Sequence, residues 1–393
     1  MSDPWLCIIG IGEDGLRGLS QASRDALSRA ELVFGGPRHL ILAEVGARGQ
    51  PWQVPFTSDP VLAARGRKVV VLASGDPFWF GVGSRLAADL TAAEWTAVPA
   101  PSTFALAAAK LGWRMEEVVC LGLHATPFEL LVRHLAPRQK LICLVRDGEA
   151  VGTLAHWLTQ QGFGKSSLWV LEALGGASER IREAQAERYA FSDVLSPVAV
   201  AVKAKGGMGL SRAAGLPDAA FVHDGQITKR PVRALTLSAL APRPGDMLWD
   251  IGAGSGSVSI EWCLAGGSAV CIEARHDRVQ NIRANAATFG VTRNLTVIER
   301  KAPAGLESLA QPQAVFVGGG ADSQLMEFLW ARVSVGTRIV VNAVTLETES
   351  LLLVEQKQRG GELLRVDLAH AAPLGPMRSW VPSRPIIQWS VVR

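Results

Sequence analysis

Several features that would assign a protein to a special class are absent from this sequence. No apolar run approaches the roughly 18 residues that a membrane-spanning helix needs, so we expect no contact with a membrane. None of the five cysteines belongs to a C-x-x-C pair, which argues against a zinc site or another metal site. All five lie in apolar runs, as expected for unpaired thiols in the reducing cytoplasm.

An excess of charge of one sign is absent as well. The net charge is +4 over 393 residues, and the basic residues are scattered along the chain. A nucleic-acid-binding surface would require a basic stripe or patch, so we expect no nucleic-acid partner. The opening residues, MSDPWLCIIGIG, lack the basic segment of a signal peptide and lead directly into a strand pattern. These absences favour a cytoplasmic protein that acts on a small molecule.

Hydrophobic residues make up 48% of the chain, which is enough for more than one core, and the length favours two or three domains. Short apolar runs alternate with helical patterns, which is typical of an α/β fold with largely parallel sheets. A stretch rich in glycine and small residues, Lys203–Asp218, interrupts this alternation and reads as a linker. We therefore predict a domain over residues 1–204, a linker over 205–216 and a domain over 217–393.

The apolar runs and helical patterns predict the following elements. Strands are expected at Leu6–Ile9, Val69–Ala73, Val118–Leu121, Leu141–Val145, Leu168–Leu171, Val198–Val202, Met247–Ile251, Ala269–Glu273, Leu295–Glu299, Ala314–Val317 and Ile339–Asn342. Helices are expected at Ser20–Ala30, Ser102–Leu111 and His276–Phe289. Two last strands, near Leu363–Leu368 and Ile386–Val392, have no helix between them and can form an antiparallel end to the second sheet.

A glycine-rich loop follows the predicted strand Met247–Ile251 with the pattern D-x-G-x-G-x-G, from Asp250 to Gly256. A dinucleotide-binding loop has G-x-G-x-x-G, but the third glycine position here is Ser257. Glu273 lies 21 residues after Gly252, at the carboxyl end of the next strand, where a carboxylate can accept hydrogen bonds from both hydroxyls of a ribose. The loop therefore favours a ribose-containing ligand without a central pyrophosphate.

Two further groups in the same loop narrow the ligand. The carboxylate of Asp250 would suit an ammonium, and the free amides at the start of the following helix would suit a carboxylate. Ribose, ammonium and carboxylate together describe S-adenosylmethionine (SAM). Two alternatives stay open from the residues alone, a nicotinamide cofactor and a tight strand-to-helix turn without a ligand.

Residues 215–393 resemble the class I SAM-dependent methyltransferases, and more narrowly the domain that methylates and decarboxylates precorrin-6B. Four segments carry the narrower resemblance: TKRPVR from Thr228, DIGAGSGS from Asp250, VGGG from Val317 and VNAVTLET from Val341. The resemblance implies cofactor contacts at Thr228, Asp250, Gly252, Ala253, Gly254, Ser255, Gly256, Glu273 and Ala302. One departure is Arg300-Lys301-Ala302, where the family often has Gly-Asp-Ala, so the adenine amine lacks an acidic partner.

A second loop near the N-terminus, GIGEDG from Gly10 to Gly15, matches the dinucleotide pattern literally. Its acidic residue would be Glu31, 21 residues after Gly10. Glu31 precedes an apolar run, however, and would lie at the wrong end of a strand to reach a ribose. An NAD-dependent oxidoreductase that uses this loop is nevertheless an alternative function.

Residues 4–203 resemble the tetrapyrrole methylase family, through SGDPFWFG from Ser74 and PAPSTFALAAAKLGW from Pro99. That family binds SAM in a cleft between two α/β lobes. The resemblance implies that Gly75, Asp76, Ser102 and Thr103 face the cofactor, and that Gly10 and Gly12 leave room near the substrate. A plain strand-to-helix turn is the alternative for these last two glycines.

The order of the two halves resembles the family of decarboxylating precorrin-6Y C5,15-methyltransferases of cobalamin biosynthesis. The implied reaction methylates C5 and C15 of precorrin-6B and removes the carboxyl group of the C12 acetate, giving precorrin-8. The resemblance assigns C5 to the N-terminal half, C15 and decarboxylation to the C-terminal half, one SAM to each half, and a homo-oligomer. A SAM-dependent methyltransferase of another tetrapyrrole is the alternative.

A precorrin carries many carboxylates, so cations near the C-terminal loop are candidates for substrate contact, although any one of them can be a plain surface charge. The substrate-binding candidates are Gly10, Gly12, Lys229, Arg233, Gly319 and Asn342. No catalytic residue is assigned, because the sequence does not indicate the proton donor for decarboxylation.

Overall fold

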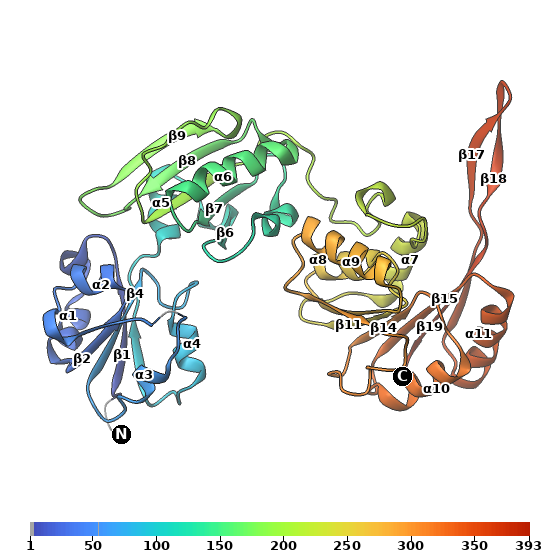
Figure 1. Cartoon of the computed structure of the whole chain (residues 1–393), viewed down its shortest axis with the longest axis horizontal. Helices are drawn as coiled ribbons and strands as arrows, with labels where there is room; N and C mark the ends of the chain where they lie inside the picture. Colours follow the sequence, from blue (N-terminus) through green and yellow to red (C-terminus); the bar gives the residue numbers. More distant parts are fainter. Residues whose placement is uncertain (1–3, 54) are drawn as a thin grey trace. The chain divides into compact units, whose positions relative to one another are not determined.

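The computed structural model describes residues 4–53 and 55–393, which form two compact units. The first unit comprises the described residues up to Phe128 together with His134–Met208. The second comprises Glu129–Arg133 and Gly209–Arg393. The main division between Met208 and Gly209 falls inside the predicted linker. Figure 1 labels the elements of both units.

The first unit begins with a parallel sheet, the N-terminal sheet. Its strands are ordered β3 (Gly49–Pro51), β2 (Leu32–Gly35), β4 (Val69–Ser74), β1 (Leu6–Ile11) and β5 (Trp95–Val98). Alternate residues of β1 enter different cores. Ile9 and Ile11 pack with Leu27 of α1 (Gln21–Arg29), whereas Leu6 and Ile8 pack with Leu86 of α4 (Gly83–Ala88). Both faces of the sheet are thus covered, as the continuous apolar runs predict.

A second sheet in the first unit, the mixed sheet, corrects the expectation of largely parallel strands. Its order is β6 (Val118–Gly122), β7 (Lys140–Leu144), β10 (Val198–Lys203), β8 (Ser167–Glu172) and β9 (Arg180–Gln185). Only β6 and β7 pair in parallel among these described strands; the other pairs are antiparallel. Apolar runs buried on both faces look alike in either orientation, so the sequence pattern does not reveal strand direction. The charged edge strand β9 has no apolar run and was not predicted.

The helices of the first unit lie between these strands. They are α1 (Gln21–Arg29), α2 (Pro37–Leu42), α3 (Asp59–Leu62), α4 (Gly83–Ala88), α5 (Thr103–Leu111) and α6 (Gly148–Leu158). The predicted helices Ser20–Ala30 and Ser102–Leu111 are confirmed to within one residue at each end. In both, the hydroxyl of the first serine accepts a hydrogen bond from the backbone three residues on, which fixes the start of the helix.

The second unit is built on the C-terminal sheet. Its order is β13 (Leu295–Glu299), β12 (Ser268–Glu273), β11 (Met247–Ile251), β14 (Ala314–Val317), β15 (Arg338–Ala343), β19 (Ile386–Val392) and β16 (Glu362–Val366). The strands from β13 to β15 are parallel, and β19 runs antiparallel to both β15 and β16. The predicted antiparallel end is therefore confirmed. Helices α7 (Arg230–Leu240), α8 (Ser257–Leu264), α9 (His276–Thr288), α10 (Ser323–Arg332) and α11 (Leu346–Arg359) complete the unit.

A hairpin between β16 and β19 was not predicted. It pairs β17 (Ala369–Leu374) with β18 (Met377–Pro382), and Figure 1 shows it extending away from the sheet of its own unit. All residues of β18 are exposed, so no hydrophobic alternation marks this strand in the sequence. Within the described part of the chain, no helix is both long and apolar enough to cross a membrane.

Arg233 of α7, a substrate candidate from the sequence, is fully buried in the second unit. Its guanidinium donates to the carboxylates of Glu261, at 2.6 Å, and Asp218, at 3.1 Å. It also donates to the backbone oxygens of Thr228 and Leu216. The prediction that Arg233 binds substrate is therefore wrong, because its donors are already used to join α7, α8 and the segment before α7.

We expect Arg233→Ala to destabilise the second unit by about 3–5 kcal/mol, because the buried carboxylate of Glu261 loses its cation. Differential scanning calorimetry of the full chain should show a lower melting temperature for the transition of the second unit only. Arg283→Ala, on the exposed face of α9, is the matched control and should change neither transition. An unchanged calorimetric profile for Arg233→Ala would contradict a structural role for this cation.

Candidate functional site

The glycine loop of the second unit follows β11 and leads into α8. Gly252, Gly254 and Gly256 have φ values of 66°, 59° and 72°, a left-handed conformation that other residues adopt only at a cost in free energy. A Cβ atom on Gly252 would lie 2.6 Å from the backbone oxygen of Gly319, and one on Gly256 would lie 3.0 Å from Ile282 of α9. The loop thus needs glycine both for its conformation and for its packing.

The carboxylate of Glu273 holds this loop in place. It lies at the carboxyl end of β12, which pairs with β11, and the residue is buried. The backbone N–H of Gly254 donates to Oε2 at 2.9 Å, and the backbone N–H of Arg275 donates to Oε1 at 3.0 Å. Each carboxylate oxygen has further lone pairs, so two more donors, such as the hydroxyls of a ribose, can be accepted.

Asp250, at the end of β11, is buried beneath the loop. Its Oδ2 accepts a hydrogen bond from the Ser259 hydroxyl at 2.7 Å. Its Oδ1 has no hydrogen-bond partner among the described residues, and neither has the buried hydroxyl of Ser255. Burial raises the pKa of Asp250 to about 6. An unpartnered carboxylate oxygen at this depth suits a ligand that brings a cation or a proton.

The other predicted contacts of the second unit lie around the same edge of the sheet. A Cβ on Gly254 would have the backbone oxygen of Gln226 as its nearest neighbour at 3.7 Å, so the segment that leads to Thr228 lies beside the glycine loop. Thr228 and Ala302 are half-buried, and Lys229 is exposed at the start of α7. A Cβ on Gly319 would meet no atom within 4 Å, so this glycine borders open space.

Asn342 of β15 has partners on two neighbouring elements. Its Nδ2 donates to the Thr236 hydroxyl at 2.9 Å, and its Oδ1 accepts from Gln388 at 3.0 Å. These bonds join β15 to α7 and β19. Substrate contact by Asn342, Lys229 or Gly319 stays a prediction.

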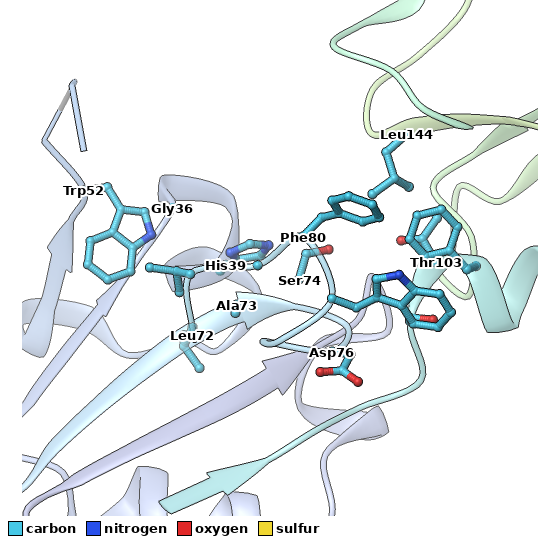
Figure 2. Close-up of a pocket in the computed structure, with 15 residues that line it drawn as sticks. Gly36, His39, Trp52, Leu72, Ala73, Ser74, Asp76, Phe80, Thr103 and Leu144 are labelled. Carbon is cyan, nitrogen blue, oxygen red and sulfur yellow. The ribbon is translucent and has the colours of Figure 1, made fainter. Parts of the chain in front are cut away.

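A cavity of about 240 Å³ lies in the first unit, at the carboxyl ends of β2, β4 and β5 (Figure 2). Three of the predicted cofactor residues, Asp76, Ser102 and Thr103, line it. Gly75 supports this arrangement: with φ of 57°, its Cβ position would lie 2.9 Å from Cα of Ser102, so the loop after β4 touches the start of α5. The structure therefore brings together the GDP turn and the P-x-S-T segment.

Two polar side chains of this cavity already accept hydrogen bonds from backbone N–H groups. Oδ1 of Asp76 accepts the N–H of Phe78 at 2.9 Å, and the hydroxyl of Ser102 caps α5 by accepting the N–H of Ala105 at 3.1 Å. Trp79 and Phe80 add aromatic surface to the lining. The cavity thus combines a flat apolar wall with a few polar groups, which suits a small molecule with an aromatic part.

The structure corrects the reason given for Gly10. A Cβ there would lie 1.9 Å from the backbone oxygen of Gly75, so the missing side chain makes room for the loop after β4 and leaves no space for a substrate. A Cβ on Gly12 would contact only Asp14. Neither glycine lines the cavity, and substrate contact by Gly12 stays a prediction.

The literal dinucleotide motif of the first unit does not form a ribose site. Glu31 precedes β2 and accepts the backbone N–H of Lys68, which precedes β4, at 2.9 Å. Both residues thus lie at the amino ends of parallel strands, whereas Gly10–Gly15 lies at the opposite, carboxyl edge. This geometry confirms that Glu31 is not positioned for a ligand at the glycine loop.

His39 of α2 also lines the cavity and was not identified from the sequence. The sequence feature that could have identified His39 is the segment GGPRH, which directly follows an apolar strand. This segment follows β2 just as the GDP turn follows β4. Burial, together with the nearby Arg38, lowers the pKa of the imidazole to about 4. His39 is therefore neutral at pH 7.

Comparisons with known families cover almost all of the chain. The family model described as tetrapyrrole (corrin/porphyrin) methylases matches residues 6–190. The model described as precorrin methyltransferase domain matches residues 219–393. The two matches correspond to the two resemblances noted in the sequence.

Among solved structures, the C-terminal domain of a precorrin-6Y C5,15-methyltransferase from Rhodobacter capsulatus is 56% identical. It covers 47% of this chain and 100% of that chain, with a TM-score of 0.46. A precorrin-6Y methylase from Archaeoglobus fulgidus is 24% identical and covers 51% of this chain and 98% of that chain, with a TM-score of 0.41.

Two curated relatives match over nearly their whole length. A protein of Sinorhizobium sp named precorrin-6Y C(5,15)-methyltransferase (decarboxylating) is 47% identical over 397 residues, covering 98% of this chain and 96% of that protein. A protein of the same name from Mycobacterium tuberculosis (strain CDC 1551 / Oshkosh) is 38% identical and covers 99% of this chain and 100% of that protein. The chain therefore belongs to the family of decarboxylating precorrin-6Y C(5,15)-methyltransferases.

Proposed function

We propose that the chain transfers two methyl groups from SAM to C5 and C15 of precorrin-6B and removes the carboxyl group of its C12 acetate, giving precorrin-8. The N-terminal domain, residues 1–204, methylates C5. The C-terminal domain, residues 217–393, methylates C15 and decarboxylates. Each unit binds its own SAM, the first at Gly75, Asp76, Ser102 and Thr103, the second at the glycine loop with Glu273.

The observation that carries the proposal is the contact between Glu273 and the N–H of Gly254 at 2.9 Å. It fixes a carboxylate at the end of β12, beside a loop whose glycines carry no side chains and so let a ligand approach the backbone closely. The ribose hydroxyls would donate to Glu273, and the unpartnered Oδ1 of Asp250 would face the ammonium of the methionine portion. Thr228 would cover the cofactor, and Ala302 would lie near the adenine, where backbone groups replace the acid that the family often has.

The reaction requires the protein mainly to position the cofactor and the substrate. When bound, SAM supplies a methyl group on a sulfonium, which an electron-rich meso carbon can attack. The chain holds donor and acceptor in line, an entropic contribution that does not require a strong base. Loss of carbon dioxide leaves an electron pair that the conjugated macrocycle can accept. Carboxylates of the substrate would meet the exposed Lys229 and the polar groups of Asn342 and Gly319.

We further propose that the protein is a homo-oligomer assembled through the hairpin β17–β18. Its exposed apolar residues are Leu374, Met377, Trp380 and Val381, with Trp380 70% exposed. A two-stranded hairpin is marginally stable by itself in water, and an exposed apolar cluster of this kind marks an interaction site. Pairing with the same hairpin of a second copy would stabilise the two strands and cover their exposed apolar residues.

Calorimetric titration of the full chain with S-adenosylhomocysteine should give two equivalents per chain. The two sites have unlike residues, so we expect two different affinities. Saturation at one equivalent would contradict the proposal of two cofactor sites.

Glu273→Ala should lower the affinity of one site for S-adenosylhomocysteine about tenfold to a hundredfold, because two charge-assisted hydrogen bonds to the ribose are lost. The other site should keep its affinity. Glu299→Ala, at the matching end of the neighbouring strand β13 but exposed, is the control and should bind as the wild type does. Equal affinities for Glu273→Ala and wild type at both sites would show that Glu273 does not hold the ribose.

Replacing Met377 and Trp380 together by serine should convert the oligomer to monomer at micromolar concentration. Light scattering after size-exclusion chromatography measures the mass directly. Val335→Ser, which removes an apolar residue that is 85% exposed outside the hairpin, should leave the mass unchanged. A wild-type mass of one chain would contradict the proposed assembly.

A further inference from the structure

His39 is held by a chain of charged side chains at the edge of the cavity in the first unit. Its Nε2 lies 3.0 Å from Nη2 of Arg38, and the Arg38 guanidinium forms an ion pair with Glu13. Its Nδ1 is buried and has no hydrogen-bond partner among the described residues. A buried polar group without a partner costs free energy, so it points to a partner that binding supplies.

The contact with Arg38 decides which nitrogen of His39 carries the proton. A guanidinium has only donors, so Nε2 of the imidazole must accept the hydrogen bond. In a neutral imidazole the other nitrogen then carries the proton. Nδ1 lies beside Gly36, which also lines the cavity, because a Cβ built on Gly36 would be 3.6 Å from it. Nδ1–H is therefore a donor beside the cavity lining, and a group that meets it has to be an acceptor.

Carboxylates are the strongest acceptors that the proposed ligands carry. Hydrogen bonds to a charged group are about twice as strong as bonds between neutral groups. The carboxylate of Asp76 also lines the cavity, but in Figure 2 it points away from the imidazole. The donor at His39 and the anion at Asp76 therefore divide the cavity into a part that favours an anionic group and a part that favours a cationic one.

Resting on the proposed function, we propose that Nδ1–H of His39 donates to a carboxylate oxygen of the ligand bound in the first unit, with Arg38 as the positioning residue that fixes the tautomer. Both the methionine portion of SAM and the side chains of a precorrin carry such a carboxylate. If the carboxylate belongs to SAM, the cofactor contacts His39, and if it belongs to the precorrin, the substrate does. Titration with each ligand separately distinguishes the two cases.

The first test is the tautomer. The chain has seven histidines, so selective ¹⁵N labelling gives a small set of imidazole signals, and the His39 signal is the one missing from His39→Asn. At pH 7 we expect a neutral ring protonated at Nδ1, and we expect Arg38→Ala to release this preference. A ring protonated at Nε2 in the wild type would overturn the proposal.

The second test follows the same signal during ligand addition. A shift with S-adenosylhomocysteine but not with 5′-methylthioadenosine, which lacks the amino-acid portion, assigns the acceptor to the cofactor carboxylate. A shift with precorrin-6B alone assigns it to the tetrapyrrole. No shift with any of the three overturns the proposal.

The third test uses substitutions. With the ligand that shifts the signal, His39→Phe should weaken one site about tenfold to a hundredfold. His39→Asn places an amide donor near the Nδ1 position and should keep the affinity within a few fold. If His39 had only a structural role, the ligand affinities of His39→Phe and His39→Asn would not differ in this way. His156→Gln, exposed on α6, is the control. These readouts do not involve methyl transfer, so a failed C5 assignment leaves them intact, and their failure leaves that assignment intact.

Discussion

The carboxylate of Glu273 accepts hydrogen bonds from two loops at once, and the geometry of the C-terminal loop depends on that contact. Glycine adopts the left-handed conformation of residues 252, 254 and 256 without the cost in free energy that other residues incur, and Glu273 fixes the position of the Gly254 N–H. Parallel strands β11 and β12 place both groups at the same edge of the sheet. The fold thus places an acidic group beside a backbone without side chains at the edge of the sheet where α/β proteins bind ligands.

The first unit forms its candidate site from different residues. Its N-terminal sheet is also parallel, and its cavity lies at the carboxyl edge, but its backbone contacts are between Gly10, Gly75 and Ser102. These contacts bring the loop after β4 against the start of α5. Donors and acceptors then come from side chains at that edge, among them Asp76 and His39. The proposed sites of the two units are therefore built from unlike residues, and two family models match separate halves of the chain.

Most of the described strands and both glycine loops could be predicted because they depend on local rules, whereas β2, β3, β5, β9, β17 and β18 were missed. Apolar runs mark buried strands, and a serine three residues before a free amide marks the start of α1 or α5. Long-range partners could not be predicted in the same way. Arg233 stands out as a cation in the sequence, yet it is buried in an ion pair with Glu261, which lies 28 positions further along the chain. The direction of β10, the hairpin β17–β18 and the role of His39 likewise depend on which segments meet in space.

The proposal that the first unit methylates C5 and the second methylates C15 is tested most directly by locating each methyl group in the product. Precorrin-6B and SAM labelled with ¹³C in the methyl group are incubated with Thr103→Trp, which fills the first cavity, or with Gly254→Val, which fills the second loop, and the products are compared by NMR and mass. We expect Gly254→Val to give a product methylated only at C5 that keeps its acetate carboxyl group, and Thr103→Trp to give one methylated only at C15 and decarboxylated. The same methyl group missing from both products would contradict two separate sites.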